Sequence, residues 1–353
     1  GTNTIRFRAP GGNWTILMPN ADWGSDIILR VIVAPDLIPP TVPTLVSPTN
    51  GALFGTNTVA LDWTDSTDTG SGVAQYDVEV ASDPGFGSIQ WTSSPAASAA
   101  TTGALPDGQH YWRVRARDNA GNVSAYSAVG DFTTDTTGPA APSLLAPADG
   151  LLTATNPVAF SWTDVWDVNG IADYRIEVDD TAAFSAPLEY ASVRTTASAS
   201  VGLLSGTHFW RAYARDNAGN VSAWSAVRSF QLDTTPPTTP SPVSPAAGAV
   251  FLTGRVDLDW TDSTDANGVA GYDVQVAPDA TFGSAIEWTG TTTASGVNTA
   301  PLASGLHYWR VRARDNAGSV SGWSAVRTFT MQDPPTTPAG VLPTDGSATW
   351  ASA

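Results

Sequence analysis

The sequence contains no cysteine and no lysine, and each absence excludes a class of function. Without cysteine the chain forms no disulfide and no thiolate-bound metal site. The 16 basic residues are therefore all arginine, and they face 33 acidic residues, for a net charge of −17 and a pI of about 4.2. Proteins bind nucleic acid and anionic membrane surfaces through basic patches. We therefore expect no nucleic-acid partner.

Long apolar runs are also missing. The nearest candidate, residues 26–35, carries Arg30 and is shorter than the ~18 apolar residues of a membrane-spanning helix. We expect no membrane insertion. No signal peptide is visible from Gly1 onward, so an exported protein with this sequence would be a mature form or a fragment.

What the chain does contain is one segment written three times. The pattern Trp-Arg-x-x-Ala-Arg-Asp-Asn-Ala-Gly begins at Trp112, Trp210 and Trp309. An earlier tryptophan recurs with the same period, at Trp63, Trp162 and Trp260. A period near one hundred residues is too long for a solenoid repeat of ~20–50 residues. It matches one small β-sandwich of ~100 residues per repeat.

Apolar and polar residues alternate with a period of two inside each copy. In the first copy the segments 59–63, 76–80 and 110–117 have this pattern. Such alternation predicts strands with one buried face and one exposed face. No segment of comparable length has a sustained helical period, so the predicted fold class is all-β.

The exposed faces of two predicted strands carry opposite charges at the same spacing. Asp77 and Glu79 lie on one strand, and Arg113 and Arg115 lie on the other. We predict that these strands are neighbours, because each opposite-charge pair across two strands contributes ~0.2–1 kcal/mol. The corresponding sets in the other copies are Arg175 and Glu177 with Arg211, and Asp273 with Arg310 and Arg312.

Proline-containing linkers separate the copies and predict the domain boundaries. The linkers begin at Asp36, Asp135, Asp233 and Asp333, and their prolines favour stiff connections and a rigid rod. Residues 1–35 do not repeat, and we expect three short strands there, at Thr4–Arg8, Trp14–Met18 and Ile27–Val33. The predicted parts are a partial β segment (1–35), three modules (36–135, 136–233 and 234–332) and the start of an incomplete fourth repeat (333–353).

Several of these features resemble fibronectin type III domains. They are Trp63 after an alternating strand, the Tyr-x-Val-x-Val strand at 76–80, Leu-Pro-Asp-Gly at 105–108 and Asp-Asn-Ala-Gly-Asn-Val-Ser from Asp118. The Asp-Thr-Thr-Pro-Pro linker at 233–237 resembles those of tandem fibronectin and Ig-like modules in large bacterial surface and secreted proteins. The resemblance covers residues 36–332 and implies three tandem β-sandwiches.

This resemblance is specific for fold and weak for function, because the same sandwich hosts many roles. Our first hypothesis is a non-catalytic structural segment of a bacterial extracellular or cell-surface protein: a filament, surface-layer or stalk component. In a filament, residues 333–353 of one chain would add strands to residues 1–35 of the next. One alternative is an adhesion or glycan-binding array, and another is a spacer of a secreted enzyme. The expected partners are other copies of the chain, other extracellular proteins or glycans.

The chain's three histidines occupy equivalent positions, His110, His208 and His307. They stand where the family usually has its corner tyrosine. We expect each imidazole to replace the tyrosine hydroxyl as a hydrogen-bond partner of a nearby backbone group. A metal or catalytic role is the less favoured alternative, and the sequence has no His-Glu-x-x-His, Gly-x-Ser-x-Gly or P-loop motif.

Acidic residues recur in the turns, linkers and loops. The loops 65–70, 164–170 and 262–268 hold paired aspartates of the kind that glycosidases use, but their turn-forming composition favours solvated loops. Carboxylates of the turns and linkers could converge on Ca²⁺ at the domain junctions, because Ca²⁺ takes 6–8 oxygen ligands. Capping of the turns by these side chains is the alternative. The candidate calcium ligands are Asp118, Asp135, Asp216, Asp233, Asp315 and Asp333.

Aromatic residues recur at fixed register, which favours core or interface positions over ligand binding. Tyr126, Trp224 and Trp323 match one another in this way. Trp166 has no aromatic counterpart in the other two copies. We therefore name Trp166 as the candidate ligand-binding residue, with stacking on a sugar ring as its expected mode.

Overall fold

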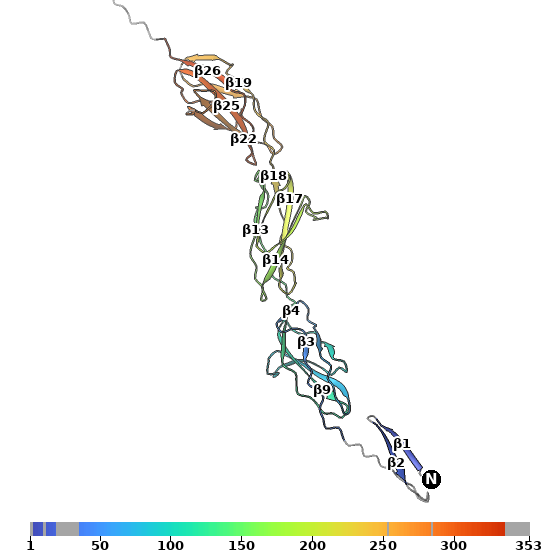
Figure 1. The fold of residues 1–353 in the computed structure, drawn as a ribbon. Coiled ribbons are helices and arrows are strands. Elements are labelled where there is room, and N and C mark those ends of the chain that lie inside the picture. The colour runs from blue at the N-terminus through green and yellow to red at the C-terminus, as the bar shows by residue number, and fades with distance from the viewer. Residues whose placement is uncertain (1–2, 10–11, 19–34, 253, 284, 336–353) are drawn as a thin grey trace, which may run out of the picture. The chain divides into compact units, whose positions relative to one another are not determined.

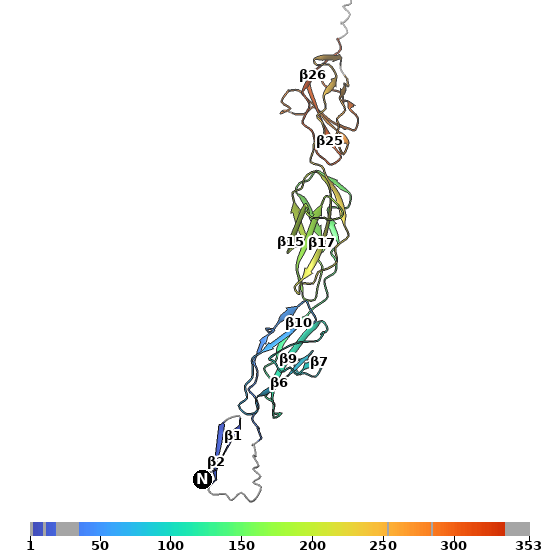
Figure 2. The same ribbon diagram turned by 90° about the vertical axis from the view of Figure 1, so that its right-hand side faces the viewer.

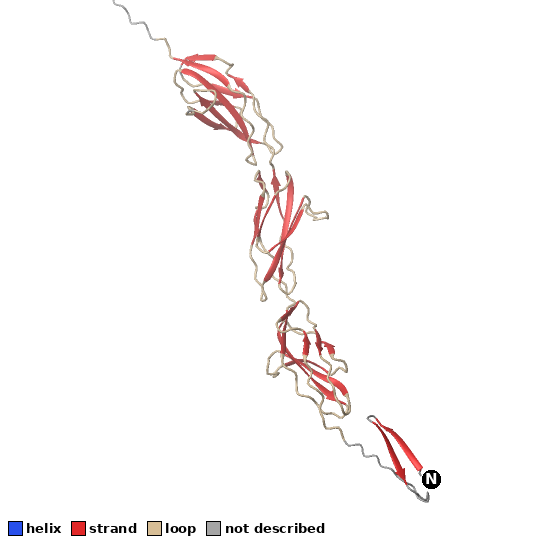
Figure 3. Ribbon diagram, viewed as in Figure 1, coloured by secondary structure: helices blue, strands red, loops and turns tan. Residues whose placement is uncertain are grey.

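The computed structural model describes residues 3–9, 12–18, 35–252, 254–283 and 285–335. Every regular element in these residues is a β-strand (Figures 1 and 3). Within this part of the chain, no helix has the length and apolar character needed to cross a membrane. The predicted all-β class is confirmed.

Three sets of eight strands follow one another along the chain (Figure 1). The first set is β3 (Leu45–Ser47), β4 (Ala52–Phe54), β5 (Ala60–Trp63), β6 (Val73–Ala81), β7 (Ile89–Ser93), β8 (Ala99–Thr101), β9 (Gly108–Asp118) and β10 (Gly130–Thr134). The second is β11 (Leu144–Ala146), β12 (Leu151–Thr153), β13 (Val158–Trp162), β14 (Ile171–Asp179), β15 (Tyr190–Arg194), β16 (Ser198–Val201), β17 (Gly206–Asp216) and β18 (Arg228–Leu232). The third is β19 (Pro242–Ser244), β20 (Ala249–Leu252), β21 (Asp257–Trp260), β22 (Val269–Ala277), β23 (Trp288–Thr292), β24 (Gly296–Asn298), β25 (Gly305–Asp315) and β26 (Arg327–Gln332). We call the three sets modules 1, 2 and 3.

Each module is a sandwich of a three-stranded and a five-stranded sheet. In module 1 the sheets have the orders β3-β5-β8 and β4-β10-β9-β6-β7. Figure 2 labels β6, β7, β9 and β10 of the five-stranded sheet. Modules 2 and 3 repeat these orders with the equivalent strands. The short second strand of each of these modules pairs in parallel with the last strand, as in β12 with β18. In modules 2 and 3 all the other neighbouring strands pair antiparallel, so strands distant in sequence close each module around one core.

The core of each module lies between its two sheets and is built on the repeated tryptophans. In module 1, Trp63 and Trp112 are 2% and 0% exposed, and their ring centroids lie 6.4 Å apart. Tyr76 packs edge-on against Trp63 with centroids 5.5 Å apart. Burying one such aromatic side chain contributes ~1.5–3 kcal/mol. The tryptophans therefore join the two sheets.

The predicted charge pairs lie across β6 and β9 and their equivalents. Asp77 stands opposite Arg115 and Glu79 stands opposite Arg113, and both pairs form salt bridges. The prediction is confirmed for module 1. In module 2, Glu177 binds Arg211 of the neighbouring strand, as expected, and it also binds Arg175 of its own strand.

Module 3 departs from the expected charge pairing at one position. Asp273 binds Arg312 and also Arg314. The predicted contact of Asp273 with Arg310 is wrong, because Arg310 lies opposite Gln275 in the strand register and donates to its Oε1 at 2.7 Å.

At the N-terminus, β1 (Asn3–Ala9) and β2 (Gly12–Met18) form an antiparallel two-stranded sheet. Two of the three strands expected in this segment are thereby confirmed. The third, Ile27–Val33, lies outside the described residues, as does most of the incomplete fourth repeat.

Candidate metal centre

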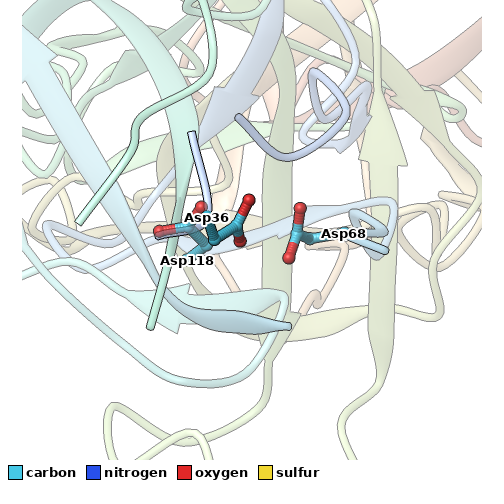
Figure 4. Close-up of side chains that lie close together, drawn as sticks. All are labelled: Asp36, Asp68 and Asp118. Atoms are coloured by element: carbon cyan, nitrogen blue, oxygen red, sulfur yellow. The ribbon is translucent and has the colours of Figure 1, made fainter. Parts of the chain in front are cut away.

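Three aspartate carboxylates come together at the start of each module. One ligand oxygen of each residue lies within 4.8 Å of the others. The three sets are Asp36, Asp68 and Asp118 in module 1 (Figure 4), Asp135, Asp167 and Asp216 in module 2, and Asp233, Asp265 and Asp315 in module 3. We call each set an aspartate triad. Its members come from the linker, from the loop after the first tryptophan strand, and from the turn after the longest strand.

The linker aspartate is held by backbone donors. In module 1, Oδ1 of Asp36 accepts the Ile38 N–H at 3.1 Å, and Oδ2 accepts the Ser71 N–H at 2.7 Å. These two bonds, with the Ile38 N–H as the larger effect, hold the pKa of Asp36 below its ordinary value. Gly70 packs directly against this carboxylate, since a Cβ there would lie 2.3 Å from Oδ2. A side chain at position 70 would therefore require the Asp36 carboxylate to move.

The loop aspartate is positioned by a core tyrosine. The Tyr76 hydroxyl accepts the Ser66 N–H at 2.8 Å, which ties the loop to strand β6. Two residues later, Oδ2 of Asp68 accepts the N–H groups of Gly70 and Gly72 at 3.2 and 2.7 Å. Tyr174 and Tyr272 make the same loop contact in modules 2 and 3. The loop thus reaches the triad because the core holds its first residues.

The turn aspartate is buried at the end of the longest strand. Asp118 is 2% exposed, and its Oδ1 accepts the N–H groups of Ala120 and Asn122 at 3.0 and 2.8 Å. The carboxylate caps a tight turn of the kind that the Asp-Asn-Ala-Gly sequence favours. The Asn119 amide then donates to the Gly72 carbonyl at 3.0 Å and joins the turn to the loop.

Such a triad is electrostatically costly unless something offsets it. Two carboxylates 4 Å apart repel by roughly 4 kcal/mol at the effective dielectric of a protein surface. The N–H donors of the linker, loop and turn compensate part of this repulsion. A set of carboxylate oxygens at this spacing also offers the hard, anionic ligands that Ca²⁺ and Mg²⁺ prefer.

The structure places five of the six predicted calcium ligands in triads. In each triad the turn aspartate lies close to the linker aspartate that opens its own module. Asp118 lies close to Asp36, and Asp216 lies close to Asp135. Asp333 belongs to none of the triads found in the described residues, and its carboxylate accepts a hydrogen bond from the Ser304 hydroxyl.

Sequence reasoning missed Asp36 and the loop aspartates as possible ligands. We expected the loops to be solvated, yet Asp167 is only 8% exposed and faces two other carboxylates. One signal was present in the sequence, because an aspartate stands three residues after Asp65, Asp164 and Asp262 in every copy.

The histidines lie in the cores. In modules 2 and 3, Nε2 of His208 and of His307 lies 2.9 Å from a backbone carbonyl, that of Leu204 or Ala303. The expected bond to a nearby backbone group is confirmed for these two residues. Nδ1 contacts a side-chain oxygen of Glu189 in module 2, 2.7 Å away.

The aromatic residues at fixed register cover arginines on the sheet. In module 2 the Arg211 guanidinium lies 4.1 Å from the Phe184 ring centroid and 4.0 Å from that of Trp224. Trp224 is half-buried in this stack. Trp166 differs from it, because 79% of its surface is exposed, on the same loop as Asp167.

Comparison with known proteins finds relatives but no matching family model. The chain is 34% identical over 316 residues to exoglucanase B of Cellulomonas fimi, a match that covers 86% of the chain and 26% of the relative. It is 33% identical over 305 residues to endoglucanase B of Cellulomonas fimi, covering 79% of the chain and 26% of that protein. It is 34% identical over 198 residues to chitinase A1 of Niallia circulans, covering 54% of the chain and 25% of that protein. The chain therefore spans only about a quarter of the length of these relatives.

Two solved structures also resemble the chain. The first is the FN1–FN3 domains of chicken CNTN1, with 15% identity and a TM-score of 0.37, which covers 84% of the chain and 99% of that structure. The second is the fibronectin(III)-like modules of Clostridium thermocellum CbhA, with 15% identity and a TM-score of 0.35, which covers 54% of the chain and 94% of that structure.

Proposed function

Because each of its three sandwiches is a fibronectin type III-like module, we propose that this chain is a non-catalytic spacer segment of a secreted enzyme that degrades a polysaccharide. The supporting observation is the kind of protein in which the segment recurs. Exoglucanase B and endoglucanase B bear names of different activities, and chitinase A1 bears a third. A segment common to such proteins does not determine which bond is cut. It fits a spacer that different catalytic domains share.

The modules have the physical properties that a spacer needs. Each buries its own tryptophan-centred core, and each is linked to the next through proline-containing segments that restrict the backbone. The net charge of −17 favours solubility and discourages self-association. The filament hypothesis that we placed first receives no support from the relatives, whose names describe enzymes.

The native polypeptide tests this proposal. An antibody raised against residues 36–332 would be used on culture supernatant and on washed cells, and the captured protein would be sequenced by mass spectrometry. We expect a secreted protein well above the 36.6 kDa of this chain, with a polysaccharide-hydrolase domain in the same polypeptide. A cell-attached polymer whose subunits contain no such domain would overturn the proposal.

The exposure of Trp166 favours a second candidate function, binding to the polysaccharide itself. Trp166 is 79% exposed and Val168 beside it is 71% exposed, so the loop presents an apolar face to solvent. Flat aromatic faces stack on the apolar faces of sugar rings. This role is compatible with the spacer role, because a spacer that contacts the substrate keeps an attached enzyme near it.

A pull-down with insoluble cellulose and with chitin tests this second candidate. We expect the Trp166→Ala variant to lose most of the bound fraction. The control is Leu204→Ala, because Leu204 is 81% exposed in the same module. Equal binding of the wild type and of both variants would rule out Trp166 as the sugar-binding residue.

A further inference from the structure

The triad of module 3 contains a buried carboxylate oxygen without a partner. Asp315 is 1% exposed. Its Oδ1 accepts the N–H groups of Gly318 and Ser319, at 2.7 and 2.8 Å. Its Oδ2 has no hydrogen-bond partner in the described part of the chain. Burying a carboxylate oxygen without a partner is energetically costly, so this oxygen is suited to bind a cation.

At the turn aspartate, modules 1 and 2 have a side-chain donor that module 3 lacks. In module 1 the Asn122 amide donates to Oδ2 of Asp118 at 2.8 Å. In module 2 the Asn220 amide donates to Oδ2 of Asp216 at 2.9 Å. Module 3 has Ser319 at this position, and its hydroxyl faces the backbone carbonyl of Asp233 at 3.5 Å. Serine in place of asparagine therefore removes the neutral amide donor, while the charged acceptor, the Asp315 carboxylate, remains.

We infer that Asp233, Asp265 and Asp315 bind one calcium ion at the start of module 3. This inference stands apart from the spacer function proposed above. The ligand oxygens of the three residues lie within 4.8 Å of one another. Oxygens bound to one Ca²⁺ at 2.3–2.6 Å can be at most about 5 Å apart, so this spacing is compatible with Ca²⁺.

The carboxylates are held in place by the protein itself. Oδ1 of Asp233 accepts the Thr235 N–H at 3.0 Å, and Oδ2 accepts the Asn267 amide at 2.6 Å. Oδ1 of Asp265 accepts the Asn267 N–H at 2.8 Å. Each carboxylate oxygen has a second lone pair, so these bonds orient the ligands and leave them able to bind a cation. Water would complete the 6–8 ligands that Ca²⁺ takes.

Calorimetric titration of the full chain with CaCl₂ at pH 7 tests the inference. We expect one tight site in the wild type, and loss of that site in Asp315→Asn. This substitution keeps Oδ1 for the turn and replaces the unpartnered oxygen by an amide. Circular dichroism verifies that the variant is folded. If it is not, Asp265→Asn replaces it, because Asp265 lies outside the turn.

Two further variants separate a metal site from a structural cluster. Ser319→Asn restores the donor present in modules 1 and 2, and we expect it to weaken calcium binding roughly tenfold or more. Asp262→Asn changes an exposed aspartate of the same loop that is outside the triad, and we expect no change. Absence of a calcium signal in the wild type, or equal calcium affinity in the wild type and Asp315→Asn, would overturn the inference. A melting temperature that rises on acidification but ignores calcium would also overturn it, because a shared proton would then fill the triad.

Discussion

In the five-stranded sheet of module 1, a single aspartate forms salt bridges with two arginines. The carboxylate of Asp77 accepts from Arg115 at 3.1 Å and from Arg117 at 2.9 Å. Burial would by itself raise the pKa of Asp77, but the hydrogen bonds from Arg117 and Arg115 outweigh it and hold that pKa below its ordinary value. Asp273 in module 3 is in the same situation.

The lowered pKa of Asp77 predicts a pH-dependent contribution to stability. A carboxyl whose pKa falls on folding stabilises the protein at any pH above the unfolded value of ~3.9, and this contribution is lost as the pH falls through the folded pKa. We expect Asp77→Asn to lower the free energy of unfolding by about 1–3 kcal/mol at pH 7. The difference from wild type should shrink as the pH drops below about 4.

Urea denaturation at pH 7 and at pH 3 measures this difference. The control is Asp65→Asn, since Asp65 is exposed and forms none of these ion pairs. An equal loss of stability at both pH values would contradict the electrostatic explanation and point to packing instead.

At the scale of elements, the segment after each longest strand folds back along that strand through two serines. In module 2 the Ser225 hydroxyl accepts the Ala212 N–H at 3.1 Å, and the Ser222 hydroxyl accepts the Ala214 N–H at 3.0 Å. Both serines are less than 10% exposed. No neighbouring strand accepts the N–H groups of Ala212 and Ala214 on that side of β17. The two serine hydroxyls accept them instead.

Removing one of these hydroxyls should leave a buried donor unpaired. We expect Ser225→Ala to destabilise module 2 by about 1–3 kcal/mol, because the Ala212 N–H would lose its acceptor. Thermal unfolding measures the effect, and Thr195→Ala, at an exposed position, is the matched control. A loss of stability no larger than that of the control would mean that another acceptor replaces the hydroxyl.

At the scale of the molecule, each core is closed within its own module. The core of module 3 contains Trp260, Trp309 and Phe329, and all its members lie between residues 251 and 331. A sandwich of ~100 residues with its own core folds independently as a rule. The residues of its aspartate triad lie within the same stretch or just before it.

We therefore predict that residues 233–335 fold when expressed alone. Denaturation should be cooperative and close to two-state, as for most domains of this size. Tryptophan fluorescence would follow the transition through Trp260 and Trp309. A broad, non-cooperative transition would contradict the prediction and would mean that module 3 needs residues outside this range.

The local sequence pattern was sufficient to predict most of the fold. Alternation with a period of two identified the strand faces, because side chains of a strand point to opposite sides at every step. The recurring tryptophans located three modules, and the matching charges of Asp77 and Arg115 indicated which strands are neighbours. The register prediction failed at Arg310, because Gln275 stands opposite it and accepts its hydrogen bonds where a carboxylate was expected.

The sequence by itself determined that this is an acidic all-β array with a core of repeated tryptophans, since these properties depend on composition and local periodicity. Only the tertiary structure decided which carboxylates meet. Asp233, Asp265 and Asp315 are far apart in the chain, and the paths of a linker, a loop and a turn bring them together. The serine at 319 is visible in the sequence, but its effect depends on contact with Asp315, and contacts between distant segments follow from packing rather than from local pattern.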